Sequence, residues 1–215
     1  MSADLAFFPI MLRLEGRKCL VVGAGEVAAA KIRGLLHHGA RVVVVSPRAV
    51  RRVEQEAREG TIVWRRRAFS AKDVNGVFLA IAATNSPPVN KAVFRACRKR
   101  GVLCNAVDDP EHCDFFYPAV VRRGPLLIAI STNGSSPALA ARLRRELEQQ
   151  FGPEWGVWVR HVGRMRRELL GREMPPEARR RRLLEMASGQ SFGAFMRGHK
   201  ARSVKSPHGK TRRKL

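Results

Sequence analysis

The sequence predicts an α/β fold in which a parallel sheet is covered by helices on both faces. Two observations lead to this prediction. Between Lys18 and about Val107, short runs of β-branched and other apolar residues alternate with amphipathic stretches. A glycine-rich turn also separates the first apolar run from the first helical pattern. Strands that are apolar along their whole length are buried on both faces, as in doubly wound sheets.

Five strands and three helices are expected in this region. The strands fall at residues 19–22, 41–45, 61–64, 77–83 and 102–107, and the helical patterns at 26–38, 49–59 and 90–100. Gly39 and Gly60 follow the first two helices, where glycine is the common terminator. The order predicts repeated βα units within residues 1–114.

The pattern changes after residue 114. FYPAVVRRGPLLIAIST contains two apolar segments around a turn signal at 122–125, which predicts a hairpin. In the next segment Ser136 is a suitable N-cap and Pro137 suits the first helical position. A hairpin plus one amphipathic helix is too small to bury its own core, so residues 115–150 are interpreted as a dimerisation region that pairs with a second copy. Residues 151–196 are expected to form a helical domain, and 197–215 a basic, disordered tail.

Composition narrows the class of protein. The 215 residues carry a net charge of +23, which would attract a polyanion. Nucleic acid is not favoured as a partner, because the aromatic residues show no base-stacking motif and much of the charge lies in the tail. A small substrate with many carboxylates accounts equally well for the basic residues of the body. No apolar run is long enough to span a membrane and no secretory signal is evident, so a cytoplasmic protein is expected.

The four cysteines have no C-x-x-C spacing, so neither a disulfide framework nor a bound metal is expected.

The motif Gly23-Ala24-Gly25-Glu26-Val27-Ala28 follows a predicted strand and opens a predicted helix. In that context G-x-G-x-x-A is the dinucleotide-binding pattern of Rossmann folds. Gly23 permits the tight turn and Gly25 lets a pyrophosphate approach the backbone. The start of the helix, at Glu26 and Val27, presents N–H groups to the phosphates. The alternative is a tight turn with no ligand.

Ser46, Pro47 and Arg48 occupy the end of the second predicted strand. An acidic residue there would bind the ribose 2′-hydroxyl of NAD, whereas an arginine suits the 2′-phosphate of NADP. Residue chemistry alone therefore leaves NAD and NADP open.

Four segments together resemble the precorrin-2 dehydrogenase family, whose members also form the N-terminal part of sirohaem synthase. They are FFPIMLRLEGRKCLVVGAGEVAAAK, LAIAATNSPPVN, CNAVDDP and FFYPAVVRRGPLLIAISTNGSSPALAARLRREL, within residues 7–170. The resemblance implies NAD-dependent oxidation of precorrin-2 to sirohydrochlorin by a homodimer. Some members of the family also insert Fe²⁺, as a substrate, into sirohydrochlorin to give sirohaem. Whether this chain is also a ferrochelatase stays open.

The resemblance places the catalytic aspartate at Asp108, which follows a predicted strand at the edge where such sheets bind ligands. Asp109 and His112 are its alternates, and turn capping before Pro110 is the competing interpretation. Asn105 and Thr84, at strand ends on the same edge, are expected to contact the cofactor. The next segment offers hydroxyl groups and the N-terminus of a predicted helix, which could bind a carboxylate of the substrate. It comprises Ser131, Thr132, Asn133 and Gly134.

A non-catalytic NAD(H)-binding redox sensor is the rival function. It explains the glycine motif but assigns no role to Asp108.

Overall fold

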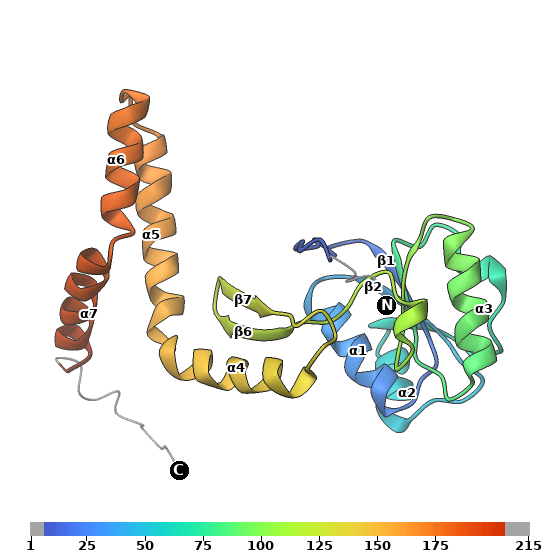
Figure 1. The fold of residues 1–215 in the computed structure, drawn as a ribbon. Coiled ribbons are helices and arrows are strands. Elements are labelled where there is room, and N and C mark those ends of the chain that lie inside the picture. The colour runs from blue at the N-terminus through green and yellow to red at the C-terminus, as the bar shows by residue number, and fades with distance from the viewer. Residues whose placement is uncertain (1–6, 205–215) are drawn as a thin grey trace, which may run out of the picture. The chain divides into compact units, whose positions relative to one another are not determined.

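The computed structural model describes residues 7–204, with side chains to residue 198 (Figure 1). Two compact units divide the chain, the first from Phe7 to Tyr117 and the second beginning at Pro118. The first unit contains the glycine-rich motif and the five predicted strands.

The first unit is built on one parallel sheet. Its strands are β1 (Lys18–Val22), β2 (Arg41–Val45), β3 (Ile62–Arg65), β4 (Leu79–Ala82) and β5 (Leu103–Ala106). They lie in the order β3-β2-β1-β4-β5, and every neighbouring pair is parallel. The chain therefore reverses its direction of winding between β1 and β4, the point at which open α/β sheets bind ligands. The predicted doubly wound fold is confirmed.

Helices cover both faces of the sheet because alternate strand residues point to opposite sides. The face that holds Cys19 and Val21 packs against α1 (Glu26–His37) and α2 (Arg51–Arg58). The face that holds Leu20 and Val22 packs against α3 (Pro87–Arg98). These side chains are almost completely buried, which explains why the strands are apolar throughout.

Two local features differ from expectation. α3 begins at Pro87 rather than near residue 90, because two prolines suit the first turn of a helix, where their missing N–H groups would be unpaired. A 3₁₀ helix, η1 (Ala71–Val74), precedes β4 and was not predicted. Ser70 and Asp73 form a capping box at its start, a device that a strand-and-helix periodicity does not reveal. A second 3₁₀ turn, η2 (Pro110–His112), follows β5.

The second unit begins with the predicted hairpin. β6 (Ala119–Arg123) and β7 (Leu126–Ile130) are antiparallel, and Gly124 in the turn has φ +56°. α4 (Pro137–Gln150) follows, and the Ser136 hydroxyl accepts a hydrogen bond from the Leu139 N–H, which confirms the predicted N-cap. Arg123 donates from Nε to the Phe151 carbonyl at 2.7 Å and from Nη2 to the Glu148 carbonyl at 2.9 Å, so it satisfies the end of α4.

Three further helices complete the second unit: α5 (Glu154–Leu170), α6 (Pro176–Met186) and α7 (Gly189–Val204). Trp158 on α5 is 5% exposed, and its ring lies 5.1 Å from that of Phe195 on α7. Trp155 stacks on Phe192 at 4.6 Å. The aromatic residues of α5 therefore hold α7 in place.

Residues 197–204 of the predicted tail are helical instead, because α7 continues to Val204. The rest of that predicted segment, 205–215, lies outside the described residues. No helix within residues 7–204 is both long and apolar enough to cross a bilayer.

Candidate functional site

A cavity of about 550 Å³ opens at the carboxyl ends of β1, β2 and β4. Its size falls in the range of small-molecule and cofactor sites, and it lies at the reversal point of the sheet. The first unit alone supplies its walls. The lining residues are Val22, Gly23, Ala24, Gly25, Val45, Ser46, Pro47, Arg48, Ala49, Val50, Ala68, Phe69, Ala83, Thr84, Asn85, Ser86 and Val89.

The two glycines of the motif differ in what surrounds them. Gly23 has φ +102°, and a Cβ on it would collide with the Ala83 carbonyl oxygen. A Cβ on Gly25 would meet nothing within 4 Å, so the space above this residue is open. Gly25 is also the N-cap of α1, and no side chain caps that helix start. The open space and the uncapped N–H groups are what a pyrophosphate requires, so these residues fit a dinucleotide.

The cavity wall after β2 carries no carboxylate. The Ser46 hydroxyl donates to the Arg48 carbonyl at 2.6 Å, and the Trp64 indole N–H donates to the Ser46 carbonyl at 3.0 Å. These bonds fix the loop that would face the ribose of a dinucleotide. Arg48 lies exposed at this end, which is the position from which an arginine reaches a 2′-phosphate.

Thr84 lies in the loop after β4 and is held by Asn90, a buried residue of α3 that sequence reasoning missed. The Thr84 hydroxyl donates to Asn90 Oδ1 at 2.7 Å, and Asn90 Nδ2 donates back to the Thr84 carbonyl at 3.0 Å. The Thr84 hydroxyl oxygen also accepts a hydrogen bond from the Ser86 N–H. A polar residue at an apolar helix position was the available signal, since a buried amide needs partners.

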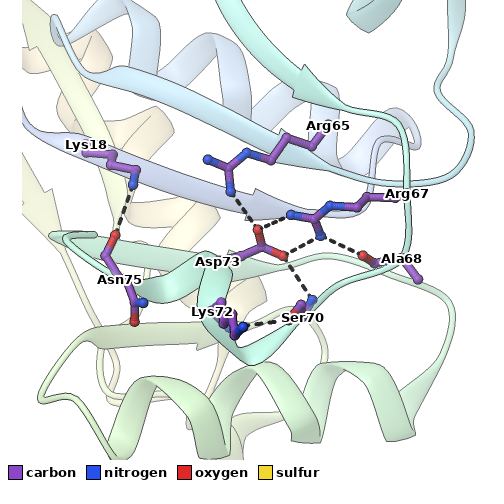
Figure 2. A network of polar contacts seen from close by, with 8 residues as sticks. All are labelled: Lys18, Arg65, Arg67, Ala68, Ser70, Lys72, Asp73 and Asn75. Carbon is purple, nitrogen blue, oxygen red and sulfur yellow. Dashed lines mark hydrogen bonds and ion pairs between the residues drawn. The ribbon is translucent and has the colours of Figure 1, made fainter.

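An ion-pair network fixes the wall formed by Ala68 and Phe69, and sequence reasoning missed it as well (Figure 2). Asp73 is 2% exposed and accepts from Arg67 at 2.6 and 2.8 Å and from Arg65 at 2.6 Å. Arg67 also donates to the Ala68 carbonyl at 2.9 Å. The hydrogen bonds from Arg67, supported by the Ser70 N–H and Arg65, lower the pKa of Asp73 to about 2 against the opposing effect of burial.

The two adjacent aspartates after β5 have different environments. Asp109 Oδ1 lies 2.8 Å from His112 Nδ1, and the His112 ring packs edge-on against Phe94. Asp108 is exposed, and within the described residues its carboxylate takes part in no hydrogen bond or ion pair. Its backbone adopts φ 60°, a left-handed conformation that is uncommon outside glycine and that Asp tolerates better than most residues. Such backbone outliers cluster at functional sites.

Neither Asp108 nor Asn105 lines the cavity. Asn105 is buried in β5 and donates from Nδ2 to the Phe115 carbonyl at 2.9 Å and to Cys113 Sγ at 3.3 Å. Glu26 and Val27 form the first turn of α1, beside the cavity wall at Gly25 but not among its lining residues. Cofactor contacts by these three residues stay predictions.

The predicted substrate segment, residues 131–134, belongs to the second unit, whereas Asp108 and the cavity belong to the first. Its hydroxyls are used within the turn that leads into α4. Ser131 Oγ accepts from the Asn133 N–H and Thr132 Oγ1 from the Ser136 N–H, both at 3.1 Å. These bonds agree with the capping interpretation, and a role in substrate binding stays a prediction. Among the described side chains, no three His, Cys, Asp or Glu residues are grouped as metal ligands.

Comparison with known proteins gives consistent matches. A family model described as a putative NAD(P)-binding domain matches residues 10–119, and one described as the sirohaem biosynthesis protein central domain matches residues 123–150. Siroheme synthase of Methylococcus capsulatus is 41% identical over 176 residues, which are 82% of this chain and 37% of that protein. Siroheme synthase 1 of Serratia proteamaculans is 38% identical over 190 residues, 88% of this chain and 40% of that protein. The chain thus spans about two fifths of the length of these relatives.

A solved structure of SirC, a precorrin-2 dehydrogenase, superposes with a TM-score of 0.75 at 29% identity. The match covers 86% of this chain and 91% of that one, so it extends over both units.

Proposed function

The chain belongs to the precorrin-2 dehydrogenase family that also forms part of sirohaem synthases, and from this premise we propose that it oxidises precorrin-2 to sirohydrochlorin with NAD. The observation that carries the proposal is the cavity at the reversal point of the sheet, with an open approach over Gly25 and an uncapped α1 start. Binding of a nicotinamide dinucleotide is a property of the family itself.

The roles of the cofactor and of the side chains can be assigned from which groups have no hydrogen-bond partner within the described residues. NAD, when bound, supplies the acceptor for the hydride that leaves the substrate. The backbone of Gly23–Gly25 and the first turn of α1 would hold the pyrophosphate, and the loop at Ser46 would hold the ribose. The Asp108 carboxylate takes the proton, so the substrate loses one hydride and one proton in all. Asp108 suits this role better than Asp109, because Asp109 is already engaged with His112.

We propose NAD rather than NADP because the family resemblance implies it, although Arg48 would suit a 2′-phosphate. We also propose that the region 115–150 pairs two copies of the chain. The support is that β6 and β7 form a two-stranded sheet, which is marginal without further packing. Sedimentation of the protein at micromolar concentration tests this, and a monomer would contradict it.

An anaerobic assay tests the proposed reaction. Precorrin-2 is mixed with protein and either NAD or NADP, and nucleotide reduction is followed by absorbance for the wild type, Asp108→Asn and Asp109→Asn. Asparagine keeps the size of the side chain and tolerates a positive φ, so the fold at residue 108 should be retained. Loss of a general base typically lowers kcat by about 10²–10⁴-fold, which we expect for Asp108→Asn but not for Asp109→Asn.

Two results would contradict the proposal. Nucleotide binding without any reduction in the wild type would favour the redox-sensor function instead. Activity of Asp108→Asn within about threefold of wild type would remove Asp108 from the reaction. Adding Fe²⁺ and sirohydrochlorin to the same three proteins, and following sirohaem formation, tests iron insertion separately with iron as the substrate.

A further inference from the structure

Lys31 of α1 and Asp108 after β5 are far apart in the sequence, and the fold brings them within electrostatic range of each other. Burial lowers the pKa of Lys31, and the Asp108 carboxylate acts on the ammonium group in the opposite sense. The Lys31 Nζ lies over the ring of Tyr117, 3.6 Å from its centroid. Among the described residues no hydrogen bond or ion pair engages this ammonium group, so beyond its contact with the Tyr117 ring it retains N–H donors for a ligand.

The surface around Lys31 is apolar and exposed. Val27 precedes Lys31 by one helical turn, so the two side chains share a face of α1. Val27 is 52% exposed and Tyr117 is 47% exposed. A partly buried cation thus lies over an exposed aromatic ring and shares its helix face with an exposed aliphatic side chain, and the Asp108 carboxylate within its electrostatic range is exposed. A flat, largely apolar molecule with acidic substituents matches both the surface and its charge.

We propose that Lys31 is a substrate-binding residue, whose ammonium group pairs with a carboxylate of the tetrapyrrole and thereby places the ring beside Asp108. This inference rests on the proposed function, because the substrate it assigns is precorrin-2. Partial burial strengthens such a pair, since the ammonium group has already lost part of its hydration and retains donors for a carboxylate. The competing role is structural: Lys31 would only hold the Tyr117 ring at the end of the first unit.

The test compares Lys31→Met, Lys31→Arg and the control Lys91→Met. Methionine keeps an unbranched stem that can pack on Tyr117, and it removes the charge and the N–H donors. Lys91 is an exposed residue of α3 outside the cavity, so its variant makes the same charge change elsewhere in the same unit. Precorrin-2 turnover is measured at saturating NAD, and uroporphyrin III binding is measured by porphyrin fluorescence without turnover.

Loss of a charge-assisted hydrogen bond corresponds to about a tenfold or greater change in binding. For Lys31→Met we therefore expect the KM for precorrin-2 to rise at least about tenfold, with kcat within about threefold and the Kd for NAD unchanged. Lys31→Arg should recover part of the affinity because it keeps the charge but not the geometry. Lys91→Met should match the wild type.

Unchanged KM and uroporphyrin binding in Lys31→Met would overturn the inference. A fall in kcat at constant KM, with a shifted pH profile, would also overturn it and assign Lys31 to the ionisation of Asp108. If the wild type fails to oxidise precorrin-2 but binds uroporphyrin III through Lys31, the proposed oxidation fails while the Lys31 site stands. If turnover is normal and independent of Lys31, the oxidation stands and this inference fails.

Discussion

Replacing Asp73 by asparagine should destabilise the first unit and weaken dinucleotide binding together. Asp73 is buried beneath Arg65 and Arg67, and its carboxylate accepts hydrogen bonds from both arginines and from the Ser70 N–H (Figure 2). Asparagine removes the charge and turns an N–H₂ group toward donors. The network also fixes the Ala68 carbonyl through Arg67, so the cavity wall should loosen in the same variant.

The magnitude follows from the pKa of Asp73. These bonds lower the pKa from 3.8 to about 2, which corresponds to about 2 kcal/mol of stability at about 1.4 kcal/mol per pKa unit. Because the folded state has the lower pKa, this stability is fully present above pH 3.8 and is lost as the pH falls toward 2. Arg65 and Arg67 are 39% and 48% exposed, so water can solvate their guanidinium groups once the carboxylate is gone. Leaving them without this partner should therefore add little to the loss of stability.

Urea denaturation followed by circular dichroism measures this difference at several pH values. Asp73→Asn should be about 2 kcal/mol less stable than wild type at pH 5–7, and the difference should shrink as the pH falls and largely vanish near pH 2, the pKa of Asp73 in the folded state. Glu54→Gln is the matched control, because Glu54 pairs with the exposed Arg58 on α2. Surface pairs of this kind contribute about 0.5 kcal/mol or less. Calorimetric titration should show several-fold weaker NAD binding for Asp73→Asn alone.

Two observations would refute this reasoning. A stability difference below about 0.5 kcal/mol at pH 7 would mean that the buried network contributes no more than a surface pair. A difference that persists unchanged at pH 2 would mean that the ionisation of Asp73 is not its source.

Two further predictions concern the glycine turn and the helical region. Gly23→Ala should lose about 3 kcal/mol of stability or more and nearly all NAD affinity, since its Cβ meets the Ala83 carbonyl at φ +102°. Gly25→Ala should keep its melting temperature but bind NAD at least tenfold more weakly; equal losses in both variants would contradict this. Trp158→Ala should cost about 3–5 kcal/mol in the second unit and release α7, seen as faster hydrogen exchange around Phe195. Retained protection there would show that α7 does not depend on this ring.

Sequence patterns alone predict the parallel sheet, the order of its helices and the glycine turn beside the cavity. These features depend on local rules: apolar runs at strand length, amphipathic helices, and glycines at a strand-to-helix turn. Gly23, Gly25, Ser46 and Thr84, which are predicted to bind the cofactor, all line the cavity because the carboxyl ends of parallel strands meet at one edge; that they bind a cofactor stays a prediction. The N-cap at Ser136 and the hairpin also depend only on residues adjacent in the sequence, and both are confirmed.

Which polar groups remain free of intramolecular partners depends on long-range packing, which sequence patterns do not reveal. Asp108 and Asp109 are equivalent in sequence, yet the fold commits Asp109 to His112 and leaves Asp108 exposed at a positive φ. The turn before α4 likewise uses the hydroxyls that the sequence offered for substrate. Three polar residues were not predicted, because each interacts with a residue on another part of the chain that only the folding brings near. They are Asn90, Asp73 and Lys31. Periodicity predicts which face of an element is apolar, but it does not specify which polar side chain that face meets.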